Sequence, residues 1–140
     1  LDSLKLARKL SESALQADTT LNVLLQVNIA SDPDKYGLDT QSVHAFADDL
    51  LAAKLAGIGL CGLMTIGRRA ADPGETRASF AALRELGDSC AARFGVDHFR
   101  ELSMGMSNDF ELAVAEGATM VRVGSAIFGP RPASNDQTLK

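Results

Sequence analysis

Two short segments near the end of the chain place small residues and a hydroxyl directly after an apolar run. The first, LSMGMS, ends on Ser107, and the second, TMVRVGS, ends on Gly124 and Ser125. Each is followed by residues with helical character. Backbone N–H groups at the start of a helix, with the positive end of the helix dipole behind them, favour an anion. If the two strands are neighbours, the two turns predict a single phosphate site.

Each turn also has a structural interpretation that needs no ligand. Ser107 is a good helix N-cap, and Asp109 and Glu111 sit favourably near the positive end of the helix that would follow it. Gly124 can simply serve a tight turn. The two motifs follow consecutive predicted strands, and this pairing is what favours the phosphate interpretation.

The elements that would position these residues alternate regularly along the chain. Apolar residues recur at helical spacing or follow a cap, which predicts helices over residues 2–17, 42–54, 73–94 and 107–117. Apolar runs with β-branched residues predict strands over residues 21–30, 58–66, 98–105 and 119–124. Alternating strands and helices imply parallel strands joined by right-handed crossovers.

Two architectures share this alternation, an open doubly wound sheet and a segment of a (βα)₈ barrel. The first normally carries a glycine-rich fingerprint after its first strand, and QVNIASDPDKYG is not one. A barrel holds phosphate after its last two strands with a short extra helix, which GMS and RVGSAIFG fit. We therefore expect an α/β fold, a partial (βα)₈ TIM barrel of four parallel strands over residues 1–129, followed by a flexible tail over 130–140.

Four strands do not close a barrel, because eight are needed for a packed interior. An isolated half would leave an apolar sheet edge and half of a barrel core exposed. We expect either a second copy of the chain or a missing N-terminal half to complete it. The chain starts inside a helical pattern and without Met, like a piece of a longer protein.

Composition excludes several other kinds of protein. The 140 residues carry a net charge of −4 and only 5% aromatic residues, which disfavours nucleic-acid binding. The apolar stretches are too broken to cross a membrane, and the opening residues do not form a secretory signal. Cys61 and Cys90 are expected to be buried, and His44 and His98 share no metal spacing with the carboxylates. A cytoplasmic protein without a metal is expected.

Several segments resemble one known family. LLQVNIASDPDKYGL, GLCGLMTI and LSMGMSNDFELAVAEGATMVRVGSAIFGPR, together with the opening LDSLKLARKL, are similar to the pyridoxal 5′-phosphate homeostasis proteins, in order and over essentially the whole chain. The resemblance implies a barrel of the alanine-racemase type. It also implies a protein that binds pyridoxal phosphate as a Schiff base and stores or delivers it, and that is not an enzyme.

The resemblance assigns roles to four residues. Ser107 would meet the phosphate, and Gly124 and Ser125 would offer backbone amides and a hydroxyl to the same group. Arg122 would point into the barrel at the pyridine nitrogen and keep that nitrogen unprotonated, which weakens the cofactor as an electron sink. By alternation Arg122 faces away from its flanking valines. Since a buried charge must be paired, an ion pair with Glu101 on a neighbouring strand is the alternative.

The Schiff-base lysine of that family lies on its first strand, upstream of the segment that matches this chain. Lys35, in the loop after the first predicted strand, is the one candidate substitute. Asn28 and Thr65 end strands and could line the rim or satisfy loop backbone, and Arg68 with Arg69 could be a solvated pair or an anion contact.

Three functions remain in competition. The first is a segment that binds pyridoxal phosphate, or phosphate or sulfate in its place, without the covalent anchor. The second is a half-barrel scaffold, natural or engineered, that dimerises without tight ligand binding. The third, a racemase-like enzyme, is disfavoured because no lysine stands at a strand end and no acid and base are paired.

Overall fold

The computed structural model describes residues 1–30, 36–67 and 72–130. The helices are α1 (Leu4–Gln16), α2 (Val43–Ala52), α3 (Pro73–Phe94), α4 (Val96–Phe99), α5 (Phe110–Ala115) and α6 (Ser125–Phe128), with a 3₁₀ turn η1 (Thr40–Ser42) before α2. The strands are β1 (Leu21–Gln26), β2 (Ile58–Met64), β3 (Glu101–Met106) and β4 (Met120–Arg122).

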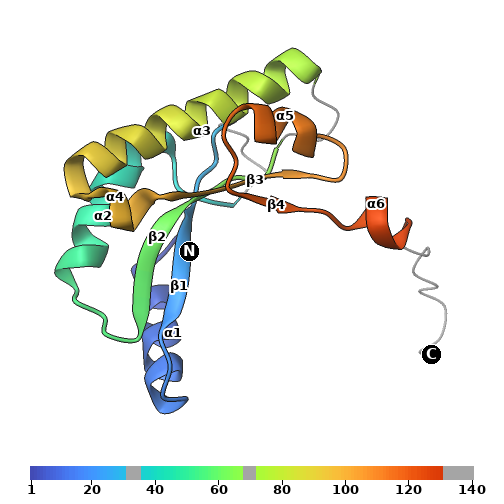
Figure 1. Cartoon of the computed structure of the whole chain (residues 1–140). Helices are drawn as coiled ribbons and strands as arrows, with labels where there is room; N and C mark the ends of the chain where they lie inside the picture. Colours follow the sequence, from blue (N-terminus) through green and yellow to red (C-terminus); the bar gives the residue numbers. More distant parts are fainter. Residues whose placement is uncertain (31–35, 68–71, 131–140) are drawn as a thin grey trace, which may run out of the picture.

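The strands form one parallel sheet in the order β1-β2-β3-β4. Figure 1 shows the sheet strongly twisted from β1 to β4, with α1, α2, α3 and α5 packed outside it and α6 projecting from the far end of β4. Neighbouring strands are also consecutive in the chain, as in a (βα)₈ barrel. The predicted half-barrel of four parallel strands is confirmed.

The long helix α3 has a clear local origin in the sequence. Its N-cap Asp72 accepts hydrogen bonds from the backbone N–H groups of Gly74 and Glu75 at 2.7 and 3.0 Å. Pro73 occupies the first turn, where its missing N–H costs nothing, and Gly95 ends the helix with φ +100°. The predicted bounds of this helix, 73–94, are therefore confirmed at both ends.

The core lies between the helices and the outer face of the sheet. Phe80 and Leu83 of α3 are fully buried, as are Leu25 of β1, Leu63 of β2 and Met104 of β3. Cys61 and Cys90 are buried free thiols, as predicted. Burial raises the pKa of the Cys90 thiol to about 11.

Several predicted boundaries are wrong by a few residues. The first strand ends at Gln26, and Val27 beyond it forms an isolated bridge with Leu38 and donates its N–H to the Met64 carbonyl. The third begins at Glu101, because the short helix α4 takes up the residues just before it. The last is only Met120–Arg122. The tail predicted over 130–140 lies almost wholly outside the described residues.

Candidate functional site

The carboxyl ends of β3 and β4 bring Ser107 together with the turn that follows β4. Ser107 Oγ accepts hydrogen bonds from the backbone N–H groups of Gly124 at 3.0 Å and Ala126 at 3.2 Å. Ser125 lies between these donors, exposed, in the first turn of α6. The predicted convergence of Ser107 on the Gly124–Ser125 turn is therefore present, with both amides directed at one oxygen atom.

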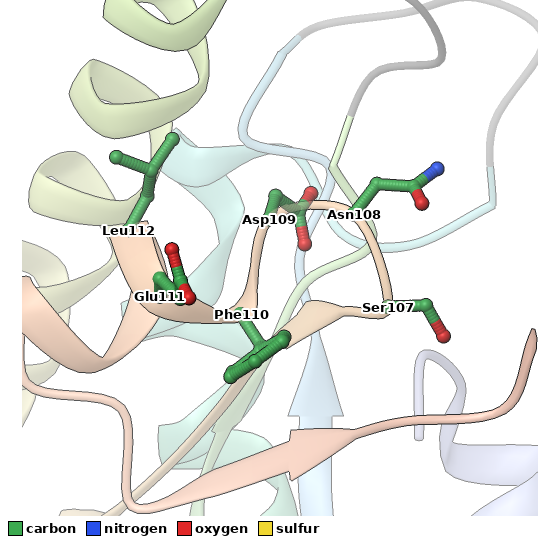
Figure 2. Close-up of a pocket in the computed structure, with 6 residues that line it drawn as sticks. All are labelled: Ser107, Asn108, Asp109, Phe110, Glu111 and Leu112. Atoms are coloured by element: carbon green, nitrogen blue, oxygen red, sulfur yellow. The ribbon is translucent and has the colours of Figure 1, made fainter. Parts of the chain in front are cut away.

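The sequence-based assignment of Ser107 as the N-cap of the next helix is wrong. That helix, α5, begins at Phe110, and Asp109 occupies its N-cap position. The Asp109 carboxylate accepts from the backbone N–H of Met106 at 2.6 Å, which closes the loop between β3 and α5. Figure 2 shows the Ser107 hydroxyl pointing away from Glu111 and Leu112, which leaves it free to reach the segment after β4.

A bulge in β3 produces this geometry. The β3–β4 register shifts between Ser103 and Met106, where Gly105 has φ +90°. A side chain would be strained in that conformation, and a Cβ there would lie 2.5 Å from the Cβ of Ala113. Glycine in the GMS motif thus allows the end of β3 to turn so that Ser107 faces the end of β4.

Arg122 lies at the end of β4 and is held by the neighbouring strand β3 and by the residue that follows β2. Its Nη1 donates to Ser103 Oγ at 2.6 Å, and its Nη2 donates to the Thr65 carbonyl oxygen at 2.9 Å. The alternative ion pair with Glu101 is not what the structure shows, because that carboxylate contacts Arg100 and the Thr119 hydroxyl. The guanidinium therefore lies at the carboxyl ends of the strands, where barrel proteins place their functional groups.

The electrostatics around Arg122 reflect partial burial. Desolvation lowers the pKa of the Arg122 guanidinium, and the nearby Asp109 carboxylate partly offsets that effect. The guanidinium keeps its charge at neutral pH and offers only donors. Asp109 also lines a cavity of about 240 Å³ together with its neighbours Ser107, Asn108, Phe110, Glu111 and Leu112 (Figure 2).

The other predicted rim residues divide into those the structure describes and those it does not. The Thr65 hydroxyl donates to the Val27 carbonyl at 2.8 Å, so this side chain satisfies backbone. The Asn28 backbone N–H donates to the Leu38 carbonyl at 2.9 Å. Lys35 and the pair at 68–69 lie outside the described residues.

Sequence reasoning missed Ser103 as part of the site. Its position two residues before Gly105, on the strand face opposite Leu102 and Met104, is a signal that alternation could have supplied. It also missed the Thr65 carbonyl, because every residue has a backbone carbonyl and the residue type does not show which one is used. Over the described residues, no group of three or more His, Cys, Asp or Glu is placed to hold a metal ion.

These features define a class of protein: half of a (βα)₈ barrel with hydroxyl, amide and guanidinium groups gathered at the carboxyl ends of its last strands. The chain belongs to the family described as the alanine racemase N-terminal domain, whose model matches residues 1–132. In the described ranges no helix has the length and apolar character that crossing a bilayer requires.

Individual relatives agree with the family match. The pyridoxal phosphate homeostasis protein of Pseudomonas aeruginosa is 41% identical over 94% of this chain and 54% of its own length. A crystal structure of an unknown protein from Bifidobacterium adolescentis is 45% identical, with TM-score 0.80, over 91% of this chain and 51% of that one. PipY of Synechococcus elongatus PCC7942 with PLP bound is 36% identical, with TM-score 0.81, over 92% of this chain and 58% of PipY. The chain thus spans about half the length of the relatives it matches.

Proposed function

We propose that this chain is the part of a pyridoxal phosphate homeostasis protein that holds the phosphate and faces the pyridine ring, without supplying the covalent anchor. The observation that carries the proposal is the convergence of the Gly124 and Ala126 amides on Ser107 Oγ. Both amides already donate to the same atom, Ser107 Oγ, and a charged phosphate oxygen is a stronger acceptor than a hydroxyl. The named relatives and PLP-bound PipY support the choice of ligand.

The residues present fit the two ends of this cofactor. Ser107, Gly124 and Ser125 would hold the phosphate through a hydroxyl and backbone amides, with the exposed Ser125 hydroxyl as a further donor. Arg122 would face the ring nitrogen, and because a guanidinium has no acceptor it would meet that nitrogen in its unprotonated form. An unprotonated ring withdraws electrons weakly, which suits storage and delivery better than catalysis.

No covalent anchor is offered by the lysines that the structure describes. Lys5 and Lys9 lie exposed on α1, and Lys54 lies between α2 and the amino end of β2. None of the three is at the carboxyl end of a strand, where Arg122 and Ser107 lie. We propose a non-catalytic role for this chain, which the relatives named as homeostasis proteins support, with a cytoplasmic location as part of the proposal.

Reduction with borohydride and intact mass measurement test the proposal. Pyridoxal phosphate is added to the chain, its reversible binding is followed by absorbance, and the mixture is then reduced and its peptides mapped. We expect saturable binding that inorganic phosphate competes away, and no single modified lysine. Absence of saturable binding would refute the phosphate site, whereas one stoichiometric adduct at Lys35 would refute the missing anchor.

A second candidate function is a scaffold completed by another half-barrel, and the edge of β4 favours it. Met120 and Val121 on this edge are about 40% exposed, and Ile127 and Phe128 after it are 67% and 85% exposed. Exposed apolar side chains beside an unpaired strand edge are typical of an interface. We propose a second copy, or the N-terminal half of a longer chain, as the partner.

The opposite edge of the sheet limits how two copies can meet. The Leu1 amino group donates to the Leu24 carbonyl at 2.8 Å, and the Gln26 N–H donates to the Leu1 carbonyl at 2.9 Å. This part of the β1 edge is therefore already paired, so a partner's β4 would have to displace Leu1 there. Light scattering across a dilution series tests self-association: a dimer supports the second copy, and a monomer at all concentrations contradicts it.

A further inference from the structure

A run of polar contacts ties the carboxyl ends of all four strands together. The Thr65 hydroxyl donates to the Val27 carbonyl, just beyond β1, at 2.8 Å, and the Thr65 N–H donates to the Ser103 carbonyl at 3.1 Å. Arg122 then donates from one nitrogen to the Ser103 hydroxyl and from the other to the Thr65 carbonyl. The guanidinium is the last member of this run, and Ser103 is the only side chain in the described part of the site that holds it.

Ser103 is an unusual residue at its position in the sheet. Its neighbours Leu102 and Met104 are buried against the helices, so Ser103 faces the other side of the sheet, where it is only 4% exposed. A buried hydroxyl costs free energy unless it is hydrogen-bonded. Its partner is the Arg122 guanidinium at 2.6 Å, which makes this a charge-assisted hydrogen bond.

We propose that Ser103 is a positioning residue that fixes the rotation and direction of the Arg122 guanidinium, and so sets the affinity for the ring of the ligand but not for its phosphate. The proposal rests on the proposed function for the identity of the ligand. Its physical basis is that one terminal nitrogen of Arg122 is bonded to Ser103 of β3 and the other to Thr65, the residue after β2. Rotation about the Cζ–Nε bond would break both bonds at once.

The phosphate end of the site is independent of this arrangement. Ser107 Oγ accepts from the Gly124 and Ala126 amides, whereas the Ser103 hydroxyl bonds to Arg122 and its carbonyl to Thr65. Loss of the Ser103 hydroxyl should therefore loosen Arg122 and leave the phosphate donors in place. A purely structural role for Ser103 predicts instead that the affinities for pyridoxal phosphate and for inorganic phosphate fall together, or that neither falls.

Two measurements on the same variants test the proposal. The first follows the side-chain ¹⁵N signals of Arg122 by NMR in the ligand-free protein, where hindered rotation gives separate signals for the two terminal nitrogens. The second measures dissociation constants for pyridoxal phosphate and for inorganic phosphate. The variants are Ser103→Ala, Ser103→Thr, which retains the hydroxyl, and Ser79→Ala as a control in α3, where the partly exposed Ser79 donates its hydroxyl to the Glu75 carbonyl.

We expect Ser103→Ala to merge the two Arg122 signals and to raise the dissociation constant of pyridoxal phosphate roughly tenfold, which corresponds to a loss of about 1.4 kcal/mol. The dissociation constant of inorganic phosphate should not change. Ser103→Thr should restore both properties, and Ser79→Ala should change neither. Unmerged Arg122 signals in Ser103→Ala, or equal weakening of both ligands, would overturn the proposal. If the wild-type chain binds neither ligand, the proposed function fails, and the NMR signals alone still decide whether Ser103 holds Arg122.

Discussion

Replacing Gly62 with alanine should separate β2 from β3 and disturb the site at their ends. A Cβ built on Gly62 lies 1.9 Å from the carbonyl oxygen of Glu101, its partner on β3. Because Cβ atoms in proteins stay at least 3.0 Å from other heavy atoms, the backbone of β2 or β3 must move by about 1.1 Å, the difference between 3.0 and 1.9 Å. A shift of that size costs about 1–3 kcal/mol as overpacking, and each ladder hydrogen bond lost adds about 1 kcal/mol.

Gly59 provides the matched control within the same strand. A Cβ there lies 3.3 Å from the Asn22 side-chain oxygen, which can move aside. Since neither glycine has a positive φ, both alanines gain the same benefit of about 0.4–1 kcal/mol from a stiffer unfolded chain. The difference between the two variants therefore isolates the backbone clash.

Urea unfolding followed by circular dichroism measures that difference. We expect Gly62→Ala to be less stable than Gly59→Ala by about 3 kcal/mol, the sum of the overpacking and hydrogen-bond costs. The pairing of Met64 with Ser103 lies two residues beyond the clash, so the Arg122 contact should loosen as well. Equal stability of the two variants would refute the strand pairing on which the site depends.

Three further outcomes follow from buried polar groups. Two arginines of α3 lower the pKa of the Glu116 carboxyl, so its stabilising effect is present above the unfolded pKa of about 4.3 and is lost as pH falls through the lower folded value. Glu116→Gln should flatten the loss of stability in urea melts between pH 5 and 3, and an unchanged acid limb would contradict this. Cys90, whose pKa burial raises to about 11, should react with a disulfide reagent at pH 8 only after unfolding; rapid labelling of the native protein would count against it. Ser11→Ala should lower the free energy of unfolding by about 1–3 kcal/mol in urea melts, because the buried Gly57 N–H, which donates to Ser11 Oγ at 3.0 Å, would lose its partner. The control Ser13→Ala, at an exposed position of the same helix, should lower it far less. Equal losses would refute the role of that hydrogen bond.

The alternation of helices and strands was predictable because each element carries its own signals. The bounds of α3, predicted over 73–94, agree with the structure, where the Asp72 cap, Pro73 and Gly95 mark its two ends locally. The end of β1 was not predicted correctly, because LNVLLQVNIA remains apolar beyond Gln26, where the strand ends. Strand ends depend on neighbours that lie far away in the sequence.

The candidate site shows the same division. Ser107 and Gly124 were placed together by a rule about consecutive strands, and their contact follows from the topology. The role of Ser107 as a cap of α5 was wrong because the bulge at Gly105 turns its side chain toward β4. Alternation could have placed Ser103 on the same side of the sheet as the site, but its contact with Arg122 depends on a distance between two strands that the sequence does not report.

The most direct test of the phosphate site is a titration of the ¹⁵N-labelled chain with pyridoxal phosphate, followed by its backbone amide signals. The account predicts saturable shifts concentrated at Gly124 and Ala126, whose amides would exchange the Ser107 hydroxyl for a phosphate oxygen. Inorganic phosphate should move the same two signals in the same direction. Shifts spread over the exposed lysines of α1, with Gly124 and Ala126 unmoved, would contradict the proposed site.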